Sequence, residues 1–545
     1  MKNTNVYTKT LFRAGVLLYT LCLAACGARL TPEPSPTPIA LPTATPEIQP
    51  VAGGELLLPI PRNPFISEGG TGANPLLVNT EEMRNMYSLV YESLVACDES
   101  NRLVPALAQK WSPDDTGRVW TVVLRNNVLW HEGDEVLSAK DIIYTFEKIK
   151  SYGKSTYYAE AASAIEQIEE VDAATMRITM KTPGAAALYS LLFPVLSSNP
   201  TTSSTNGTGP YKIVSATETM VELKKNSRWW RQAPYIESVR CLSRESNSVA
   251  LDSFEAGQLN MVPTSTVSAG KYREEGVTNV LDIMSQDAEV LLVNHVNAGL
   301  RNADVRRALA HAIDRSSIVS NVYMNRAMIC DVPVPPDSFL YDESTKSYDY
   351  NPGRASTLLT SAGWSDADGD GILEQGTRKL KLKLLVNEST ENAYRNNAAA
   401  LIAAQLLKVG IETEIVTAKL SIADEESGFV KKLAAGEFDL ALAGFNLERS
   451  GNLAPYLTGS RSYGNIPAER WKPLLKSAAS APDEKAMREA HSALQQEFVR
   501  ELPFIMLYFR MNSLVYNANI QNVGEVRSTD VLRTVSRWYI KTAGS

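Results

Sequence analysis

The stretch DADGDGILE, from Asp366 to Glu374, gathers carboxylates at a spacing that could hold a metal ion. Aspartates stand at its positions 1, 3 and 5 and glycine at position 6, as at the beginning of a calcium-binding loop. Position 12 of such a loop supplies a bidentate glutamate, and here it is Thr377. Two oxygen ligands and one negative charge are therefore missing. The pattern favours a turn or hairpin built on Asp-Gly, with weak calcium binding as the alternative, and no metal site is predicted.

Residues suited to catalysis form no recognisable arrangement in the sequence. The tetrapeptide SYGK, from Ser151 to Lys154, fits the S-x-x-K pattern of penicillin-recognising serine enzymes, but the K-T-G strand of those enzymes is missing. The sequence also lacks G-x-S-x-G, H-E-x-x-H and P-loop motifs. Its four histidines are scattered singly, at His131, His295, His311 and His491. These absences point away from catalysis, and we predict neither catalytic residues nor a cofactor.

The N-terminus has the pattern of a segment that is removed during export. Three basic residues precede an uncharged apolar stretch from Ala14 to Ala25, which is too short to cross a bilayer as a helix. The stretch ends in LAAC, with the cysteine at position 26, and this resembles the lipobox of bacterial lipoproteins. We predict that residues 1–25 are a signal peptide and that Cys26 becomes lipidated. Cys22 is a weaker candidate, and an ordinary secretory signal is the alternative.

A proline- and threonine-rich tract follows this cysteine, and residues 26–52 are predicted to be a tether. Such a composition cannot bury a hydrophobic core and favours extended polyproline II structure. At ~3.1 Å per residue, the tract could hold a folded domain roughly 60 Å from a surface. A disordered tail without a role is the alternative. Next to a lipidated cysteine, a tether is the better interpretation.

The rest of the 545-residue chain has the composition of a globular protein, and its length indicates more than one domain. A net charge of −7, with acids and bases interspersed, gives no sign of a nucleic-acid partner. No apolar run of 18 or more residues follows residue 50, so no further membrane segment is expected. Cys97, Cys241 and Cys330 are far apart and odd in number. They are expected to be buried thiols, with one disulfide as the alternative.

Hydrophobic periodicity predicts an α/β architecture. Apolar residues recur at helical spacing in the segments 81–96, 304–313, 392–409 and 484–500. Asp304 is expected to cap the second of these helices. Strand-like runs lie at 55–60, 120–125, 175–180, 411–416, 438–443 and 504–508, and the polar stretch 201–209 indicates a loop between domains. Strands that alternate with helices of this length are typical of an α/β protein.

Six stretches of the chain carry a resemblance to one family. They are LVPALAQKWSPDDTGRVWTVVLRNNVLWHEGDEVLSAKDIIYTFEKI (103–149), GTGPYKI (207–213), KNSRWWRQAPYIESV (225–239), DVRRALAHAIDRSSIV (304–319), YNPGRASTLLTSAGWSDADGDGI (350–372) and GEFDLALAGF (436–445). In this order they resemble the family 5 extracellular solute-binding proteins, the large binding components of peptide-type ABC importers. The resemblance covers essentially all of the chain from about residue 53. Six motifs in one order are far more specific than any one of them.

The resemblance implies an α/β, two-lobed fold similar to that of periplasmic binding proteins, with an extra subdomain inserted in lobe I. Lobe I is expected to comprise residues 53–90, 205–290 and 508–545. The extra subdomain is expected at residues 91–204 and lobe II at residues 291–507. The two lobes of such proteins close on a ligand, so the binding site is expected between them.

The resemblance also implies individual ligand contacts. Relatives that bind dipeptides or oligopeptides hold the ligand ammonium with an aspartate shortly after the strand that here reads DLALAGF, and the matching carboxylate is Glu448, with a surface residue at a loop tip as the alternative. The arginine that pairs with the ligand carboxylate in dipeptide-type relatives is replaced by Ser389. This departure argues against dipeptide specificity and leaves longer peptides, nickel complexes or sugars open. Further contacts are expected from Phe445, Asn446, Asn387, Tyr394, Thr71 and Gly72.

The predicted function follows from these implications. The protein is expected to capture a peptide or another small solute, as a monomer, and to deliver it to the permease subunits of an ABC importer. A lipid anchor at Cys26 would hold it at the extracytoplasmic face of the bacterial cell membrane. A secreted lipoprotein hydrolase and a sensing lipoprotein of the same fold, without a transport role, are the alternatives.

Overall fold

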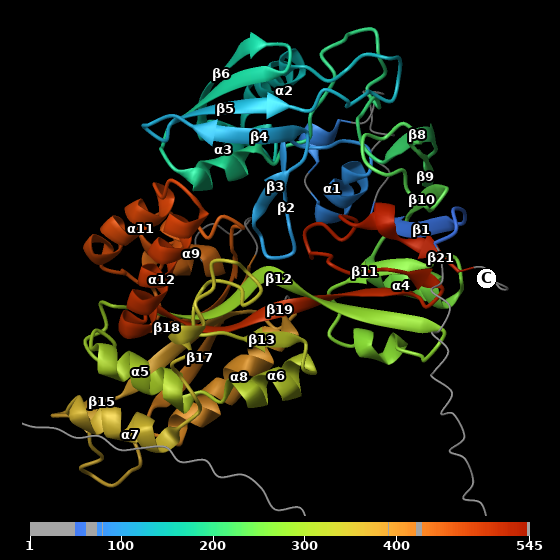
Figure 1. Ribbon diagram of the computed structural model, residues 1–545. Helices are drawn as coiled ribbons and strands as arrows, with labels where there is room; N and C mark the ends of the chain where they lie inside the picture. Colours follow the sequence, from blue (N-terminus) through green and yellow to red (C-terminus); the bar gives the residue numbers. More distant parts are fainter. Residues whose placement is uncertain (1–49, 62–73, 79, 391, 421–427, 542–545) are drawn as a thin grey trace, which may run out of the picture. The chain divides into compact units, whose positions relative to one another are not determined.

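The computed structural model describes residues 50–61, 74–78, 80–390, 392–420 and 428–541 (Figure 1). The segment Pro50–Ser545 forms one compact unit. The predicted signal peptide, Cys26 and most of the predicted tether lie outside the described residues, and so do Thr71 and Gly72. Along the described chain, strands and helices alternate as the periodicity predicts.

The first part of lobe I is a four-stranded sheet in the order β1, β10, β9 and β8. Its strands are β1 (Glu55–Ile60), β8 (Tyr211–Ala216), β9 (Met220–Lys225) and β10 (Ser238–Ser243). The strand predicted at 55–60 is confirmed, with Leu56, Leu58 and Ile60 buried on one face. Helix α1 (Glu81–Ser88) packs on that face, and α4 (Asn247–Glu255) belongs to a second cluster that contacts Leu57. Both faces of β1 are therefore covered.

Helix α1 is shorter than the periodicity predicts, because it ends at Ser88 rather than at residue 96. The carbonyl oxygens of Leu89 and Val90 accept hydrogen bonds of 2.9 Å from the backbone N–H groups of Tyr211 and Gly209. These long-range bonds occupy the carbonyls that a continuing helix would need. The chain instead forms β2 (Val95–Cys97), which pairs with β3 (Leu103–Pro105).

The segment predicted as the extra subdomain contains its own antiparallel sheet, in the order β4, β5, β7 and β6. The strands are β4 (Ala108–Pro113), β5 (Val119–Leu124), β6 (Ile165–Asp172) and β7 (Thr175–Met180). Strands β5 and β7 confirm the predictions at 120–125 and 175–180. Helix α2 (Ala139–Tyr152) begins with a capping box, in which the Ser138 N–H donates to the Asp141 carboxylate at 2.9 Å. A hydrophobic cluster of its own joins this sheet to α2 and to α3 (Ala159–Ser163).

The largest sheet has seven strands and contains the segments predicted at 411–416, 438–443 and 504–508. Its order is β11, β19, β12, β18, β16 and β17, with β13 paired to β19. The strands are β11 (Met261–Thr264), β12 (Thr278–Val293), β13 (Ala327–Ile329), β16 (Lys381–Asn387), β17 (Glu412–Ala418), β18 (Leu440–Asn446) and β19 (Phe504–Asn517). A small pair near the C-terminus consists of β20 (Ile520–Gln521) and β21 (Tyr539–Ile540).

Strands β12 and β19 run side by side through both lobes (Figure 1). One end of the pair, with Ile283 and Leu514, belongs to the hydrophobic cluster of lobe I. The other end, including Val290 and Phe504, belongs to the cluster of lobe II. The register shifts between Met284 and Ala288, where the cluster also changes. This bulge precedes residue 290, the predicted boundary between the lobes, by a few residues. The boundary itself stays a prediction.

Helices cover the lobe II part of the large sheet. They are α5 (Ala303–Ala312), α6 (Arg315–Tyr323), α7 (Pro352–Ser361), α8 (Ala393–Leu407), α9 (Phe429–Ala435), α10 (Ala454–Leu457), α11 (Trp471–Ala479) and α12 (Glu484–Glu501). The helices predicted at 304–313, 392–409 and 484–500 are present. The expected cap at Asp304 is wrong, since the side chain of Asn302 caps α5 by accepting from the Asp304 N–H at 2.9 Å.

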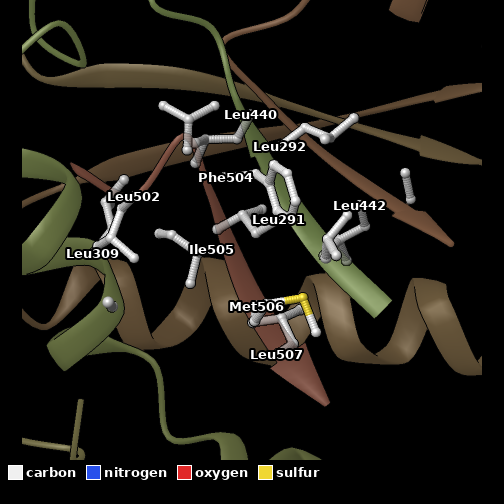
Figure 2. Close-up of a cluster of buried hydrophobic side chains, with 14 of the residues drawn as sticks. Leu291, Leu292, Leu309, Leu440, Leu442, Leu502, Phe504, Ile505, Met506 and Leu507 are labelled. Atoms are coloured by element: carbon white, nitrogen blue, oxygen red, sulfur yellow. The ribbon is translucent and has the colours of Figure 1, made fainter. Parts of the chain in front are cut away.

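The core of lobe II is built from three neighbouring strands and a helix. Figure 2 shows Leu291 and Leu292 of β12, Leu440 and Leu442 of β18, and Leu309 of α5 close to the start of β19. All of them are buried. Because β18 and β19 are buried on both faces here, they are nearly continuous apolar runs, and this explains why no period-two alternation marks them at their beginnings.

The three described cysteines are buried and unbridged, as expected for small apolar residues. Burial raises the pKa of Cys241 and of Cys330 to about 12, so both thiols stay protonated. Cys97 is also buried.

A buried ion pair fixes β12 to α8. The guanidinium of Arg395 donates two hydrogen bonds of 2.9 Å to the carboxylate of Glu289, and a third of 3.0 Å to Asn387 Oδ1. Glu289 is only 2% exposed. Because removing one partner leaves the other charge uncompensated, such a pair is costly to break.

We expect Glu289→Gln to lower the free energy of unfolding by about 3 kcal/mol, because the Arg395 charge would stay buried without a counter-charge. Urea unfolding followed by circular dichroism measures this change. The matched control is Glu166→Gln, which removes an exposed ion pair with Arg118 and should cost less than about 1 kcal/mol. Equal losses in the two variants would contradict the assigned importance of the buried pair.

Candidate ligand-binding site

A cavity lies between the two lobes and the extra subdomain. Its volume is about 710 Å³, within the range of about 300–1,000 Å³ that is usual for small-ligand sites. Lobe I contributes residues around α1 and the pair Thr529–Asp530, and the extra subdomain contributes residues around α3. Lobe II contributes the loop 446–453 after β18 and parts of α11 and α12. A ligand in this cavity would contact all three parts of the fold.

Five tyrosines form much of the cavity wall. They are Tyr87, Tyr91, Tyr157, Tyr158 and Tyr189. Burial raises the pKa of Tyr87, Tyr91, Tyr158 and Tyr189 well above the ordinary value, so these phenols stay neutral. Tyr91 donates to the Ser204 carbonyl at 2.6 Å and Tyr189 to the Asn101 carbonyl at 2.5 Å. Anchored in this way, the rings offer apolar faces to a ligand at a small cost in side-chain entropy.

Glu448 and Asn446 lie in the wall of the cavity, as expected. Along β18 and the loop after it, Phe445 and Leu447 are buried while Asn446 and Glu448 are exposed to the cleft. The Asn446 amide donates to Asp287 at 2.8 Å. The Glu448 carboxylate accepts from Ser450 Oγ at 3.1 Å and from Asn452 Nδ2 at 3.2 Å. Two neutral donors therefore hold the carboxylate in place and leave its charge uncompensated.

A second carboxylate, Glu160 of α3, lines the same cavity from the extra subdomain. Among the described residues neither acid has an ion-pair partner within 4.0 Å. Loss of surrounding water raises the pKa of Glu448, and the charge of Glu160 raises it further. Although the side chain of Glu448 is exposed to the cleft, the surrounding protein removes part of the water that would stabilise its charge. The two acids give this end of the cavity a negative potential.

The other expected contacts lie elsewhere. Phe445 packs in the core, with its ring 4.3 Å from that of Tyr456. Asn387 is fully buried at Arg395, and Tyr394 is a surface residue beside Tyr323. None of the three lines the cavity. The physical reason for Phe445 is the alternation along β18, which turns it to the face opposite Asn446.

Arg449 joins the two lobes and was not singled out by the sequence. It follows Glu448, and its guanidinium donates to the Thr529 carbonyl at 3.4 Å and also to the Thr529 hydroxyl. The carboxylate of Asp530 lies close enough to offset the cost of burying this charge. A contact between residues 80 positions apart leaves no local signal, so it can be seen only in the structure.

Main-chain groups also meet across the cleft. The Ala185 N–H of the extra subdomain donates to the Ala481 carbonyl of lobe II at 2.8 Å. Gly184 has a φ of +114°, and a Cβ there would lie 2.3 Å from the Ala479 carbonyl oxygen. On the other side, the Phe339 N–H donates to the Ser100 carbonyl at 2.9 Å. The extra subdomain and lobe II are therefore in direct contact around the cavity.

Buried polar groups complete the wall. The Gln286 Oε1 and His491 Nδ1 atoms are buried and have no hydrogen-bond partner among the residues with a described structure. Burial lowers the pKa of His491 to about 4, so the ring is neutral near pH 7. In the described part of the chain, no hydroxyl or thiol is hydrogen-bonded to this ring.

The acidic loop lies outside the cavity wall. A bridge between Ser365 and Glu374 closes this loop. The loop leads into a hairpin of β14 (Glu374–Gln375) and β15 (Arg378–Lys379), whose turn is Gly376-Thr377 rather than Asp-Gly. Carboxylate oxygens of Asp366, Asp368 and Glu374 come within 4.8 Å of one another. The Lys379 ammonium pairs with Asp368 at 2.8 Å and also with Asp370. An internal cation thus neutralises part of the charge that a calcium ion would otherwise bind.

A two-lobed α/β fold with a ligand cavity between its lobes defines a binding protein. The family model of bacterial extracellular solute-binding proteins, family 5, matches residues 102–465 through its middle region. The chain belongs to this family of solute-binding proteins.

Similarity to known proteins extends over most of the chain. The oligopeptide-binding protein AppA of Bacillus subtilis (strain 168) is 24% identical over 504 residues, covering 86% of this chain and 89% of AppA. The dipeptide-binding protein of Escherichia coli (strain K12) is 23% identical over 417 residues, covering 70% of this chain and 75% of that protein. The structure of HbpA2 from Haemophilus parasuis superposes with a TM-score of 0.76 at 21% identity, covering 90% of this chain and 100% of HbpA2. The fold is therefore shared over nearly its whole length.

We expect Gly184→Ala to weaken ligand binding about tenfold, because the new Cβ would force the extra subdomain away from lobe II. Small-angle scattering at saturating ligand should show a larger radius of gyration for this variant than for the wild type. The control is Gly133→Ala, which also has a positive φ but no atom within 4 Å of its Cβ, and should leave the scattering unchanged. Unchanged scattering of both variants would contradict a role for the Gly184 contact.

Proposed function

We propose that this protein captures a peptide in the cavity between its lobes and delivers it to the permease of an ABC importer. The observation that supports a peptide ligand is the cavity wall itself, in which neutral tyrosines surround carboxylates without ion-pair partners. The similarity to oligopeptide- and dipeptide-binding proteins points to the same ligand class. Such a protein binds and releases its solute without chemical change.

Glu448 is the proposed anchor of the peptide ammonium group, with Glu160 beside it. A buried ammonium group needs a counter-charge and hydrogen-bond acceptors, because desolvation of an unpaired charge is costly. The two acids supply both from opposite sides of the cleft. Gln286 Oε1 and the tyrosine hydroxyls offer further acceptors for peptide N–H groups, each of which would cost about 1–3 kcal/mol if buried unpaired.

Closure would couple binding to recognition by the permease. Ligand contacts to both lobes favour the arrangement in which the lobes meet, and this shifts the population toward the closed state. The strands β12 and β19 connect the lobes and continue through both cores, so the bulge between Met284 and Ala288 is the proposed pivot. The clamp of Arg449 on Thr529 would form and break with each cycle.

The proposed location is the extracytoplasmic face of the bacterial cell membrane. Cleavage after Ala25 and lipidation of Cys26 would anchor the protein, and the Pro/Thr-rich tether would keep the binding unit clear of the lipid. In the described residues no helix combines the length and apolarity needed to span a bilayer. The protein would act as a monomer that meets permease subunits, without a nucleic-acid partner.

The test of this function is the binding of a randomised tripeptide pool, measured by calorimetry, with scattering before and after saturation. We expect binding with a smaller radius of gyration, and we expect Glu448→Gln to weaken binding at least about tenfold, because the ammonium group loses its counter-charge. Recovery of the peptides unchanged would agree with binding and not with hydrolysis. Absence of binding by the wild type would refute a peptide ligand.

The control for charge loss is Glu170→Gln, an exposed position of β6 outside the cavity, which should bind as the wild type does. Acid gives an independent readout. Because the pKa of Glu448 is raised, its carboxylate becomes protonated at a higher pH than an ordinary glutamate, and affinity should fall as the pH drops through that value. Binding by Glu448→Gln should lack this loss.

We expect Cys26→Ser to leave the protein unprocessed or released into the medium, because serine cannot carry the thioether-linked lipid. Membrane fractionation and incorporation of a labelled fatty acid measure the outcome. Cys22→Ser is the matched control and should be lipidated normally. If Cys26→Ser remained lipidated while Cys22→Ser did not, the anchor would be Cys22.

A further inference from the structure

In the described residues, the place at which dipeptide-type relatives are expected to hold a ligand carboxylate contains no free cation. Ser389 is exposed and lies outside the cavity wall. The nearby Arg395 is bound to Glu289 and Asn387. Any carboxylate inside the cavity must therefore pair with a group from another part of the chain.

Of the residues that the structure describes, two arginines line the cavity, Arg84 and Arg449. The Arg449 guanidinium already forms intramolecular contacts, because it donates to Thr529 and lies beside Asp530 and Cys97. A ligand could use this guanidinium only by breaking the clamp between the lobes. Arg84 is the remaining candidate.

Arg84 lies on α1 of lobe I, a helix that is fixed by its cap. Thr80 caps α1, and the Arg84 N–H donates to the Thr80 carbonyl at 3.1 Å. The Arg84 guanidinium stacks on the ring of Tyr157, 4.0 Å from its centroid. Because Tyr157 belongs to the extra subdomain, this contact positions the guanidinium between two parts of the cavity wall. Stacking orients the plane of the guanidinium but uses none of its hydrogen-bond donors.

The Arg84 guanidinium forms no hydrogen bond to another described residue. Its Nη1 atom is buried and lacks a hydrogen-bond partner within that part of the chain. Among the described residues Arg84 also has no ion-pair partner within 4.0 Å. The acid one turn earlier on the helix, Glu81, compensates little, because burial raises its pKa to about 7 despite the attraction of Arg84. Arg84 is half-buried, and its buried Nη1 atom is a donor that a ligand carboxylate can pair with, commonly through two parallel hydrogen bonds.

We propose that Arg84 binds the carboxylate of a short zwitterionic ligand whose cationic group lies at Glu448 and Glu160. The inference rests on the proposed function and specifies its substrate class. The cation comes from lobe I, while the acids come from lobe II and the extra subdomain. A zwitterion therefore bridges all three parts and favours their closed arrangement. Both charged ends lie within a cavity of about 710 Å³, so the ligand is a peptide of a few residues with a free C-terminus.

The experiment compares one randomised tripeptide pool in three forms, free, C-terminally amidated and N-acetylated, against the full-length protein. Calorimetry should show that amidation weakens binding by the wild type at least tenfold. Arg84→Gln should bind the free and the amidated pools equally weakly, while N-acetylation should weaken binding by both proteins. Arg84→Lys should restore part of the preference for the free carboxylate, since it keeps the charge but not the planar fork.

Two controls separate recognition from folding. Arg118→Gln removes an exposed arginine of the extra subdomain and should keep the wild-type preference. The thermal midpoint of ligand-free Arg84→Gln identifies any loss of stability, which would weaken all three pools alike rather than erase one preference. Equal binding of the free and amidated pools by the wild type would overturn the proposal, and so would a preference that survives in Arg84→Gln. Either result leaves peptide capture intact, whereas failure of the wild type to bind any pool would refute the proposed function itself.

Discussion

The pairing of β12 with β19 is the constraint on which the rest of this structure depends. These two long strands contribute to the hydrophobic clusters of both lobes, and they place β18, with its loop to Glu448, at the edge of the cavity. They are separated by more than 200 residues of chain, so the pairing closes a very long loop. The burial of both faces at the lobe II end stabilises this closure. A bulge in the middle of the pair provides flexibility where the two cores meet.

Local signals in the sequence were reliable where the structure is local. The strands β1 and β7 were predicted at their observed bounds, because proline ends the first run and strict alternation marks the second. The extent of α1 was overestimated, since the carbonyl groups of Leu89 and Val90, directly after the helix, accept hydrogen bonds from residues more than 100 positions later. The cap of α5 was misplaced by two residues because asparagine and aspartate are both good caps. Long-range hydrogen bonds and near-equal alternatives are thus the two sources of error.

The site residues also divide into those with a local signal in the sequence and those without one. Family resemblance led to Glu448, and the alternation after Phe445 was already a signal that Asn446 and Glu448 share one face while Phe445 belongs to the core. Arg84 carried no such signal, because on a helix with a buried face its type and spacing are those of an ordinary surface residue. It becomes notable only when tertiary structure places Tyr157 over it and leaves its guanidinium unpaired. Arg449 and Thr529 likewise meet only in three dimensions.

The main-chain hydrogen bond between Ala185 and Ala481 affects how the protein responds to the salt concentration around it. An N–H group and a carbonyl carry no net charge, so dissolved ions scarcely screen their hydrogen bond. The exposed ion pair of Arg102 with Glu484, which also spans the cleft, weakens as ionic strength rises. A protein outside the cytoplasm meets salt concentrations that the cell does not regulate. Its lobes therefore meet through a contact whose strength changes little between fresh and saline surroundings.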